Sequence, residues 1–337
     1  MKDEAGRSRR DFFNTCVAGA VALGAGEMAI AKTPFGSAGE SKSKAVITRD
    51  EAFDGASSTP DSVRVEKLLD KAMQSFFGAS DPVTPGKKIV RPGEVVGLKV
   101  NTIAGQDLST NRALVEAISE RWKQAGVKPG TIVGGDRWSW ELERVGYHIT
   151  TDVNRERVDG TDAAEIGREA ESLSFGKVSR QFSKLLTRTC ECTINLPLLK
   201  DHELGGVTCA LKNMYGAINK PNKLHDDNCS PYVADLYMIP PIKEKFRFAI
   251  CDAMTGISEG GPMYKPEYTW KYNGLIAASD PVDLDYTRWQ IIERKRAEKG
   301  LKSQTDAGRP PKYFAVAADA QHRLGTDEPT RIALTEV

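Results

Sequence analysis

Apolar residues in the first part of the chain follow two alternating spacings, one typical of helices and one of buried strands. Within residues 61–78 they recur every three or four positions, which predicts a helix with one buried face. Residues 94–101 and 130–136 are short apolar runs beside Pro-Gly or Gly-Gly pairs, and they predict buried strands. Residues 110–126 predict a second helix that begins at Thr110, a suitable N-cap, and ends at a glycine.

The second half of the chain continues this alternation. It predicts strands over residues 192–199, 247–254 and 274–280, and a helix over residues 205–218. Asp280 supplies an N-cap and Pro281 a first helical residue for a long helix that follows. Short buried strands alternating with amphipathic helices predict an α/β fold, in which a mostly parallel sheet carries helices on both faces.

The N-terminal segment has the features of an export signal. Two arginines in SRRDFF precede a weakly apolar run over residues 15–26 and a small-x-small site that ends at Ala31. This order is typical of twin-arginine signals, although an ordinary amphipathic helix is the alternative. We expect residues 1–31 to be a signal peptide, residues 32–60 a linker because of their Ser, Gly, Lys and Ala content, and residues 61–337 a single α/β domain.

An export signal predicts the location of the protein and one of its partners. The apolar run is shorter than the roughly 20 residues that span a bilayer, so no membrane span is expected in the mature chain. We expect a periplasmic or otherwise extracytoplasmic protein that has the twin-arginine export machinery as a partner, unless an uncleaved signal leaves it tethered. The net charge of +1 argues against a nucleic-acid partner.

Cysteine usage does not indicate a cluster or a set of disulfides. Beyond the signal the chain has five cysteines, an odd number, without a ferredoxin-like run. Cys190 and Cys192 are spaced as a metal-binding pair would be, but two small buried side chains are the more common reason for this spacing. An iron–sulfur cluster is therefore less expected than a mononuclear or dinuclear metal, and the cofactor stays open.

Candidate chemistry gathers where the predicted strands end, which is where open α/β sheets bind ligands. Residues 200–202 leave one strand, and Gly205 and Gly206 open the predicted helix, whose free amides and dipole favour an anion. Thr208 and Lys212 share one face of that helix. A lysine within an apolar helix needs a partner, which would be a bound phosphate or carboxylate, unless its side chain reaches the surface.

Two histidines and two carboxylates complete the candidate set. His202 and His225, with Asp226, would form a metal site or an acid–base pair, although their spacing matches no standard zinc pattern and lone histidines are usually structural. Asp252 and Glu259 lie in a glycine-rich loop that would hold a cation or a base, or would simply need glycine for its turn.

Several ordered motifs resemble a known family. They are NLPLLKDHELGGVTCALKNMYGAI, then His225, ICDAMTGISEGGP and GLIAASDPVDLD, preceded by VGLKVN and IVGGD. Together they resemble the bacterial and archaeal family called domain of unknown function 362, over roughly residues 90–330. The resemblance implies a redox or iron–sulfur association, but the fused ferredoxin module of some members is missing here, so that association does not carry over. The motif matches fall on Lys99, Asn101, Asp136, Asn195, Pro197, Lys200, His202, Thr208, Lys212, Asn213, Gly216, His225, Asp252, Gly261, Pro262, Asp280, Pro281 and Asp285.

Two functional hypotheses follow. The first is an exported enzyme that acts on a small anionic molecule, with a possible metal or redox cofactor. Its predicted catalytic residues are Lys200, His202, Lys212, His225 and Asp252, its anion-binding residues Lys99, Asn101, Gly205, Gly206, Thr208 and Asn213, and its metal ligands His202, His225 and Asp226. The second is a protein that binds an anion or solute, or assists assembly, without chemistry.

Overall fold

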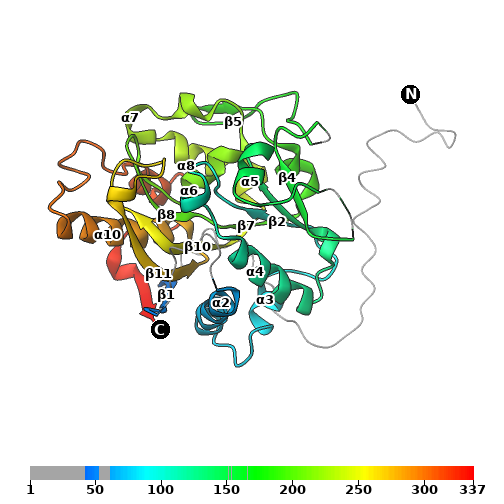
Figure 1. Cartoon of the computed structure of the whole chain (residues 1–337). Coiled ribbons are helices and arrows are strands. Elements are labelled where there is room, and N and C mark those ends of the chain that lie inside the picture. The colour runs from blue at the N-terminus through cyan, green and yellow to red at the C-terminus, as the bar shows by residue number, and fades with distance from the viewer. Residues whose placement is uncertain (1–41, 53–60, 151, 153, 165) are drawn as a thin grey trace. The chain divides into compact units, whose positions relative to one another are not determined.

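A ten-stranded sheet runs through the protein in the order β12-β1-β11-β10-β7-β2-β3-β4, with β8 beside β10 and β9 beside β8 (Figure 1). The computed structural model describes residues 42–52, 61–150, 152, 154–164 and 166–337. The strands are β1 (Ser43–Arg49), β2 (Val96–Lys99), β3 (Ile132–Asp136), β4 (Arg157–Gly160), β7 (Cys192–Asn195), β8 (Leu198–His202), β9 (Gly206–Thr208), β10 (Phe246–Ile257), β11 (Thr269–Ala278) and β12 (Ile332–Glu336). A separate two-stranded sheet consists of β5 (Leu173–Phe175) and β6 (Val178–Arg180).

Most neighbouring strands in the large sheet are parallel. Strands β4, β3, β2, β7 and β10 form one parallel series, and β10–β8 and β1–β12 are also parallel pairs. Antiparallel pairing occurs where β11 lies between β10 and β1, and where β9 returns along β8. The predicted α/β fold with a mostly parallel sheet is confirmed.

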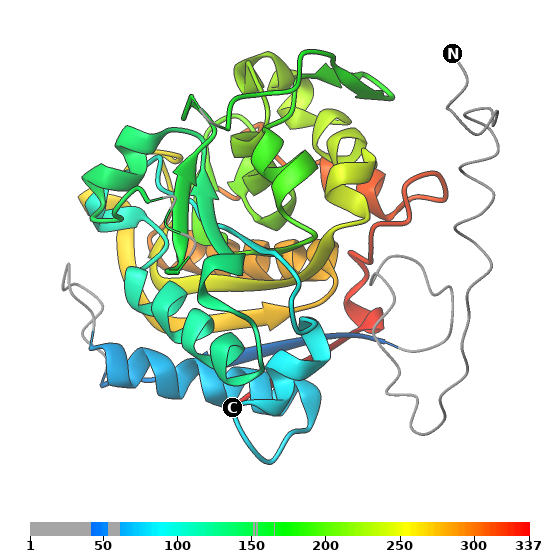
Figure 2. The same ribbon diagram turned by 90° about the vertical axis from the view of Figure 1, so that its right-hand side faces the viewer.

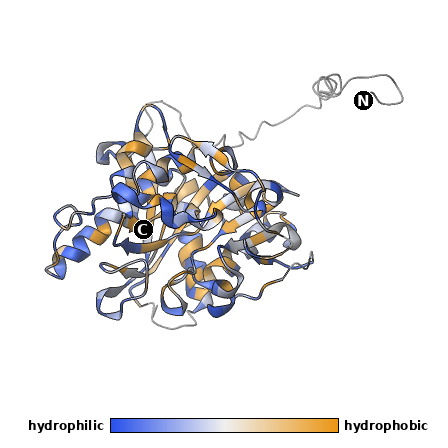
Figure 3. Ribbon diagram, turned by 90° about the horizontal axis from the view of Figure 1, so that it is seen from above, coloured by the Kyte–Doolittle hydropathy of each residue, from blue (hydrophilic) through white to orange (hydrophobic). Residues whose placement is uncertain are grey.

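Helices cover both faces of this sheet (Figure 2). They are α2 (Ser62–Phe77), α3 (Thr84–Ile89), α4 (Arg112–Gln124), α5 (Ser139–Arg144), α6 (Ala210–Asn213), α7 (Asp226–Cys229), α8 (Tyr232–Tyr237), α9 (Pro240–Lys243), α10 (Pro281–Glu298) and α11 (Tyr313–Ala318). Each face of the sheet has its own hydrophobic core, and alternate residues of β10 point into one or the other. Ala249 and Cys251 pack with α8 and α10, whereas Phe248 and Ile250 pack with α2 and α4. Viewed by hydropathy, apolar residues gather on the strands between the helical layers (Figure 3).

The predicted helix starts are largely correct. The carboxylate of Asp61 accepts hydrogen bonds from the amides of Val63 and Arg64 at the start of α2. Asp280 caps α10 in the same way, as predicted. The cap predicted at Thr110 is wrong by one residue, because Asn111 precedes α4. The hydroxyl of Thr110 instead donates to the Leu196 carbonyl, which is 2.8 Å away.

The segment from residue 192 to residue 218 differs most from its prediction. The expected single strand is broken at Leu196 and Pro197 into β7 and β8. The expected helix over residues 205–218 is also wrong: β8 and β9 form a hairpin, and only a short α6 and a 3-10 turn over Met214–Ala217 follow. Gly206 has a φ of 74°, a conformation that glycine adopts readily, and it starts the return strand.

The N-terminal part is only partly described. The predicted twin-arginine signal and its cleavage after Ala31 lie outside the described residues. Strand β1 lies within residues 32–60, so part of the predicted linker belongs to the sheet. Its central residues Ala45, Val46 and Ile47 are buried, which explains its place between β11 and β12. No helix in the described ranges has the length and apolar character needed to cross a membrane.

Candidate functional site

A cavity of about 140 Å³ lies beyond the carboxyl ends of β2 and β3. The β8–β9 hairpin, α6 and the segment leading to α7 supply its other walls. Its lining residues are Asn101, Ile103, Asp136, Arg137, Glu141, His202, Thr208, Lys212, Asn213, Tyr215, Gly216, Pro221, Asn222, His225 and Pro262. The structure therefore brings together, at one edge of the sheet, several residues that were predicted from positions far apart in the chain.

Lys212 lies between the two predicted histidines. Its Nζ is 2.9 Å from Nε2 of His202 and 3.0 Å from Nε2 of His225. The two imidazole rings stack with their centroids 5.3 Å apart. The ring of Tyr215 lies under the same amine, 4.8 Å from Nζ. Lys212 is 5% exposed, so these rings and the cavity form its surroundings.

Backbone amides determine which nitrogen of His202 carries a proton. Its Nδ1 accepts hydrogen bonds from the amides of Leu204 and Gly205, at 3.1 and 3.3 Å. Nδ1 is therefore unprotonated, and a neutral ring carries its hydrogen on Nε2. This Nε2–H points at Nζ of Lys212, which must accept the hydrogen bond. An ammonium group has no lone pair and would be unable to accept it.

His225 has the opposite tautomer. Its Nδ1 is 3.3 Å from the carbonyl oxygen of Asn222, which only accepts, so Nδ1 carries the proton. Nε2 then accepts from Lys212. One directed chain results, in which His202 donates to Lys212 and Lys212 donates to His225. The chain is complete only if Lys212 is an unprotonated amine.

Burial favours the same protonation states. It lowers the pKa of Lys212 to about 8, so the free amine is the main form above that pH and a minor form at pH 7. Burial also lowers the pKa of His225 to about 4 and holds the pKa of His202 well below its usual value. After burial, the positive charge of Lys212 is the next largest cause of both lowered histidine pKa values. Burial therefore disfavours a positive charge on any of the three side chains, Lys212, His202 and His225. Of the three, Lys212 titrates nearest to neutral pH.

A buried polar network underlies the cavity. Nζ of Lys99 is 2.7 Å from a carboxylate oxygen of Asp136, and Nζ of Lys200 donates to the side-chain oxygen of Asn101 at 2.8 Å. Asn101 in turn donates to Asn213. Burial lowers the pKa of Lys200 to about 7. Lys99 and Lys200 do not line the cavity, so they support its wall, whereas the two asparagines face the cavity.

Three further polar side chains reach the cavity. The hydroxyl of Thr208 and one carboxyl oxygen of Glu141 are buried and have no hydrogen-bond partner among the described residues. Burial raises the pKa of Glu141, and the neighbouring charge of Asp136 adds to this effect. Arg137 stacks on the ring of Trp138 beside them. The sequence analysis missed Arg137 and Glu141, although Arg137 directly follows the strand end at Asp136 and so carried the signal used for the other residues.

The helix start predicted at Gly205 and Gly206, on which the anion site was based, is wrong. Gly205 lies in the turn of the hairpin and Gly206 begins β9, and the first helical amides belong to α6. The amides of Ala210 and Leu211 donate to the buried carboxylate of Asp285, at 2.6 and 3.0 Å. The protein's own carboxylate thus occupies the place predicted for a bound anion.

Asp252 does not lie with the other predicted catalytic residues. It is buried and accepts hydrogen bonds from the amide and side chain of Asn111 and from the amide of Met254, which accounts for both of its oxygens. Glu259 in the same loop pairs with Arg296 and Arg309. Both carboxylates therefore hold the fold together, and neither lines the cavity.

The predicted three-ligand metal site is not assembled. Nζ of Lys212 lies between His202 and His225, where a shared ion would have to be, and Asp226 is exposed to solvent. Among the residues that the structure describes, no group of three or more His, Cys, Asp or Glu side chains is placed to hold a metal ion. The five cysteines from Cys190 to Cys251 are free and buried. His202, His225 and Asp226 therefore do not form the metal site predicted from the sequence.

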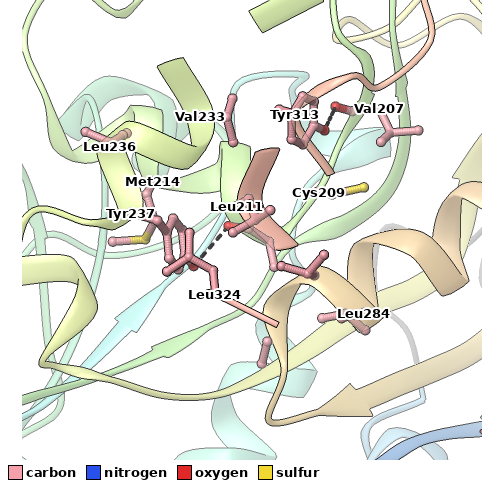
Figure 4. Close-up of a cluster of buried hydrophobic side chains, with 14 of the residues drawn as sticks. Val207, Cys209, Leu211, Met214, Val233, Leu236, Tyr237, Leu284, Tyr313 and Leu324 are labelled. Atoms are coloured by element: carbon pink, nitrogen blue, oxygen red, sulfur yellow. Dashed lines mark hydrogen bonds between the residues drawn. The ribbon is translucent and has the colours of Figure 1, made fainter. Parts of the chain in front are cut away.

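The segment that carries Lys212 is anchored on both sides. Leu211 and Met214 point into an apolar cluster with Tyr237 and Tyr313 (Figure 4). The hydroxyl of Tyr313 donates to the carbonyl of Val207 at 3.0 Å. From α10, Asp285 holds the start of α6 as described above. Lys212 thus projects from a short helix with little freedom to move.

The family assignment rests on residues 96–290, which match the family described as "Domain of unknown function (DUF362)". The chain belongs to this family. The matched range includes Lys212, both histidines, Arg137 and Glu141, so the cavity is built almost wholly from the DUF362 region. Membership shows the family without assigning a reaction.

A distant structural similarity adds little. A Thermotoga maritima protein, whose crystal structure comes from the Northeast Structural Genomics Consortium, has 8% sequence identity to this chain and a TM-score of 0.37. The match covers 73% of this chain and 60% of that protein, less than two thirds of its length. No curated protein is significantly similar in sequence.

Proposed function

We propose that this protein is an enzyme that acts on a small anionic molecule, with the unprotonated amine of Lys212 as its reactive group. The directed hydrogen bonds from His202 to Lys212 and from Lys212 to His225 carry this proposal. A lysine held as a free amine is a nucleophile and a base at near-neutral pH, which an ordinary surface lysine is not.

The state of Lys212 favours catalysis over simple anion binding. A site that only bound an anion would gain from a charged ammonium, yet burial and the hydrogen bond from His202 disfavour that charge. Glu141, whose pKa is raised by burial, places a carboxyl group for proton transfer in the same cavity. Arg137 is the cation that remains to bind the anionic group of the ligand.

The reactivity of Lys212 tests this proposal directly. Competitive labelling with trace acetic anhydride from about pH 6 to about pH 11, followed by peptide mass spectrometry, should give a midpoint for Lys212 near 8. The exposed Lys223, eleven residues away, serves as the reference lysine in the same digest. A Lys212 midpoint near the ordinary lysine value of 10.5 would contradict an unprotonated amine.

Turnover separates the enzyme from the binding protein. Purified protein incubated with a metabolite extract should convert at least one small anion, and Lys212→Met, which keeps the apolar stem, should abolish that conversion. A compound that is retained equally by wild type and by His225→Gln, and is never converted, would favour the non-catalytic alternative.

We also propose that the protein works outside the cytoplasm after twin-arginine export. Support comes from Arg9 and Arg10 and the weakly apolar run behind them. Changing both arginines to lysine should leave the full-length chain in the cytoplasm, as measured by cell fractionation, while a Lys2→Arg control exports normally. Unchanged export of the double variant would rule this route out.

A further inference from the structure

We infer that Lys212 forms a covalent imine with the carbonyl carbon of a small 2-oxo acid. This inference rests on the proposed function and narrows it to one class of substrate. Four features support it: the hydrogen bonds of the amine require its unprotonated form, its cavity is small, a proton acceptor is already in contact with the amine, and a cation lines the same cavity. Each imposes a separate requirement on the ligand.

Cavity size limits the ligand. A volume of about 140 Å³ is close to that of an engineered protein cavity of about 150 Å³ that binds benzene, a molecule of about six non-hydrogen atoms. Pyruvate and glyoxylate are of this size. The lining next to Lys212 includes the rings of His202, His225 and Tyr215.

Proton positions match the steps of imine formation. As Nζ of Lys212 attacks the carbonyl carbon, a C–N bond forms, the C–O π bond breaks and the nitrogen loses a proton to Nε2 of His225, which already accepts from it. Glu141 is the acid available to protonate the oxygen. The hydroxyl then takes the proton held by His225 and leaves as water, the nitrogen lone pair forms the C=N bond, and the last N–H proton goes to the Glu141 carboxylate, which restores both groups. Amine and carbonyl thus become imine and water, and no oxidant or reductant is consumed.

His202 and Thr208 have distinct parts in this scheme. The lone pair that attacks is the one that accepts from Nε2–H of His202 in the free protein, so the substrate must displace that hydrogen bond. His202 then has a donor available for the substrate oxygen. Thr208 lines the same cavity and its buried hydroxyl has no partner among the described residues, so a rotation about its Cα–Cβ bond would let it donate to the carboxylate.

Arg137 is the residue that would bind the carboxylate of the 2-oxo acid. The two buried lysines of the network bind Asp136 and Asn101, so they are not offered to the ligand. A guanidinium pairs well with a carboxylate, through two parallel hydrogen bonds. A neutral carbonyl compound of the same size would fit the cavity and lack this contact.

Reductive trapping tests the inference. Full-length purified protein is incubated with pyruvate, glyoxylate or acetone and then with sodium borohydride, which fixes an imine as a stable secondary amine. We expect one reduced pyruvate or glyoxylate group on Lys212 by peptide mass spectrometry. Arg137→Gln should lower trapping of pyruvate about tenfold, the loss of one charge-assisted interaction, and leave trapping of acetone unchanged.

The controls separate this inference from the proposed function. Lys212→Arg should show no adduct in the cavity, and label on the exposed Lys223 measures background. A Lys212 that is acetylated with a midpoint near 8 but never trapped by either acid would overturn the imine and leave the proposed function standing. Equal loss of pyruvate and acetone trapping in Arg137→Gln would overturn the role given to the carboxylate.

Discussion

Replacing Arg288 with methionine is expected to lower the free energy of unfolding by about 3–5 kcal/mol, because the change leaves a buried carboxylate without its cation. Arg288 is fully buried. Its Nη2 donates to the carbonyls of Leu198 and Thr208, at 2.6 and 3.0 Å, and its Nη1 lies 3.5 Å from Asp285. One side chain therefore joins β8, β9 and the carboxylate that holds α6, and urea unfolding should show the loss.

The loss of unfolding free energy in Arg288→Met should increase as pH rises. Burial raises the pKa of Asp285 to about 7, against the pull of Arg288 and two amides. Without Arg288 the pKa rises further, so the variant gains stability from a protonated Asp285 at low pH and loses it as pH rises. The difference between wild type and Arg288→Met should be larger at about pH 8 than at about pH 5.

A matched control lies on the same helix. Arg294 is exposed on α10, and Arg294→Met should change stability by no more than about 0.5 kcal/mol. Equal effects of the two substitutions, or a deficit in Arg288→Met that does not vary with pH, would show that Arg288 and Asp285 do not act as described.

Much of the fold was predictable because it follows from local apolar periodicity. The helices at Ser62–Phe77 and Pro281–Glu298 carry their caps and their buried faces within one continuous stretch. The strands that end at Lys99 and Asp136 are short apolar runs, and parallel pairing puts their ends at one edge. That rule also explains why Asn101 and Lys212, far apart in sequence, were expected near one another.

The remainder depended on contacts that no local pattern contains. Strand β9 was predicted as the start of a helix because its apolar residues suit either spacing, and it is a strand because it pairs with β8. Asp285 accepts from the amides at the actual start of the helix, and it lies 75 residues away from Ala210. The role of Lys212 changed for a similar reason, as its partners are two histidines rather than an anion. Long-range partners decide such roles, and a single sequence does not display them.

Replacing Gly216 with alanine should disrupt the wall of the cavity. A Cβ on Gly216 would lie 2.5 Å from a carboxylate oxygen of Asp136 and 2.8 Å from Nζ of Lys99. Those two atoms form the buried ion pair under the cavity and are 2.7 Å apart. Because both side chains are buried and hold each other, we expect a loss of about 3 kcal/mol in unfolding free energy, from overpacking and a weakened pair.

Gly134, on the strand that ends at Asp136, provides the matched control. Its added Cβ would meet its nearest atoms at 3.7 Å, an ordinary contact, so Gly134→Ala should be nearly neutral. If the wall positions the reactive group, Gly216→Ala should also shift the acetylation midpoint of Lys212, because Lys99 connects through Asn213 to the residues beside it. A Gly216→Ala protein with wild-type stability and an unchanged Lys212 midpoint would mean that the wall yields easily, and that Lys212 is held by α6 and the two histidines alone.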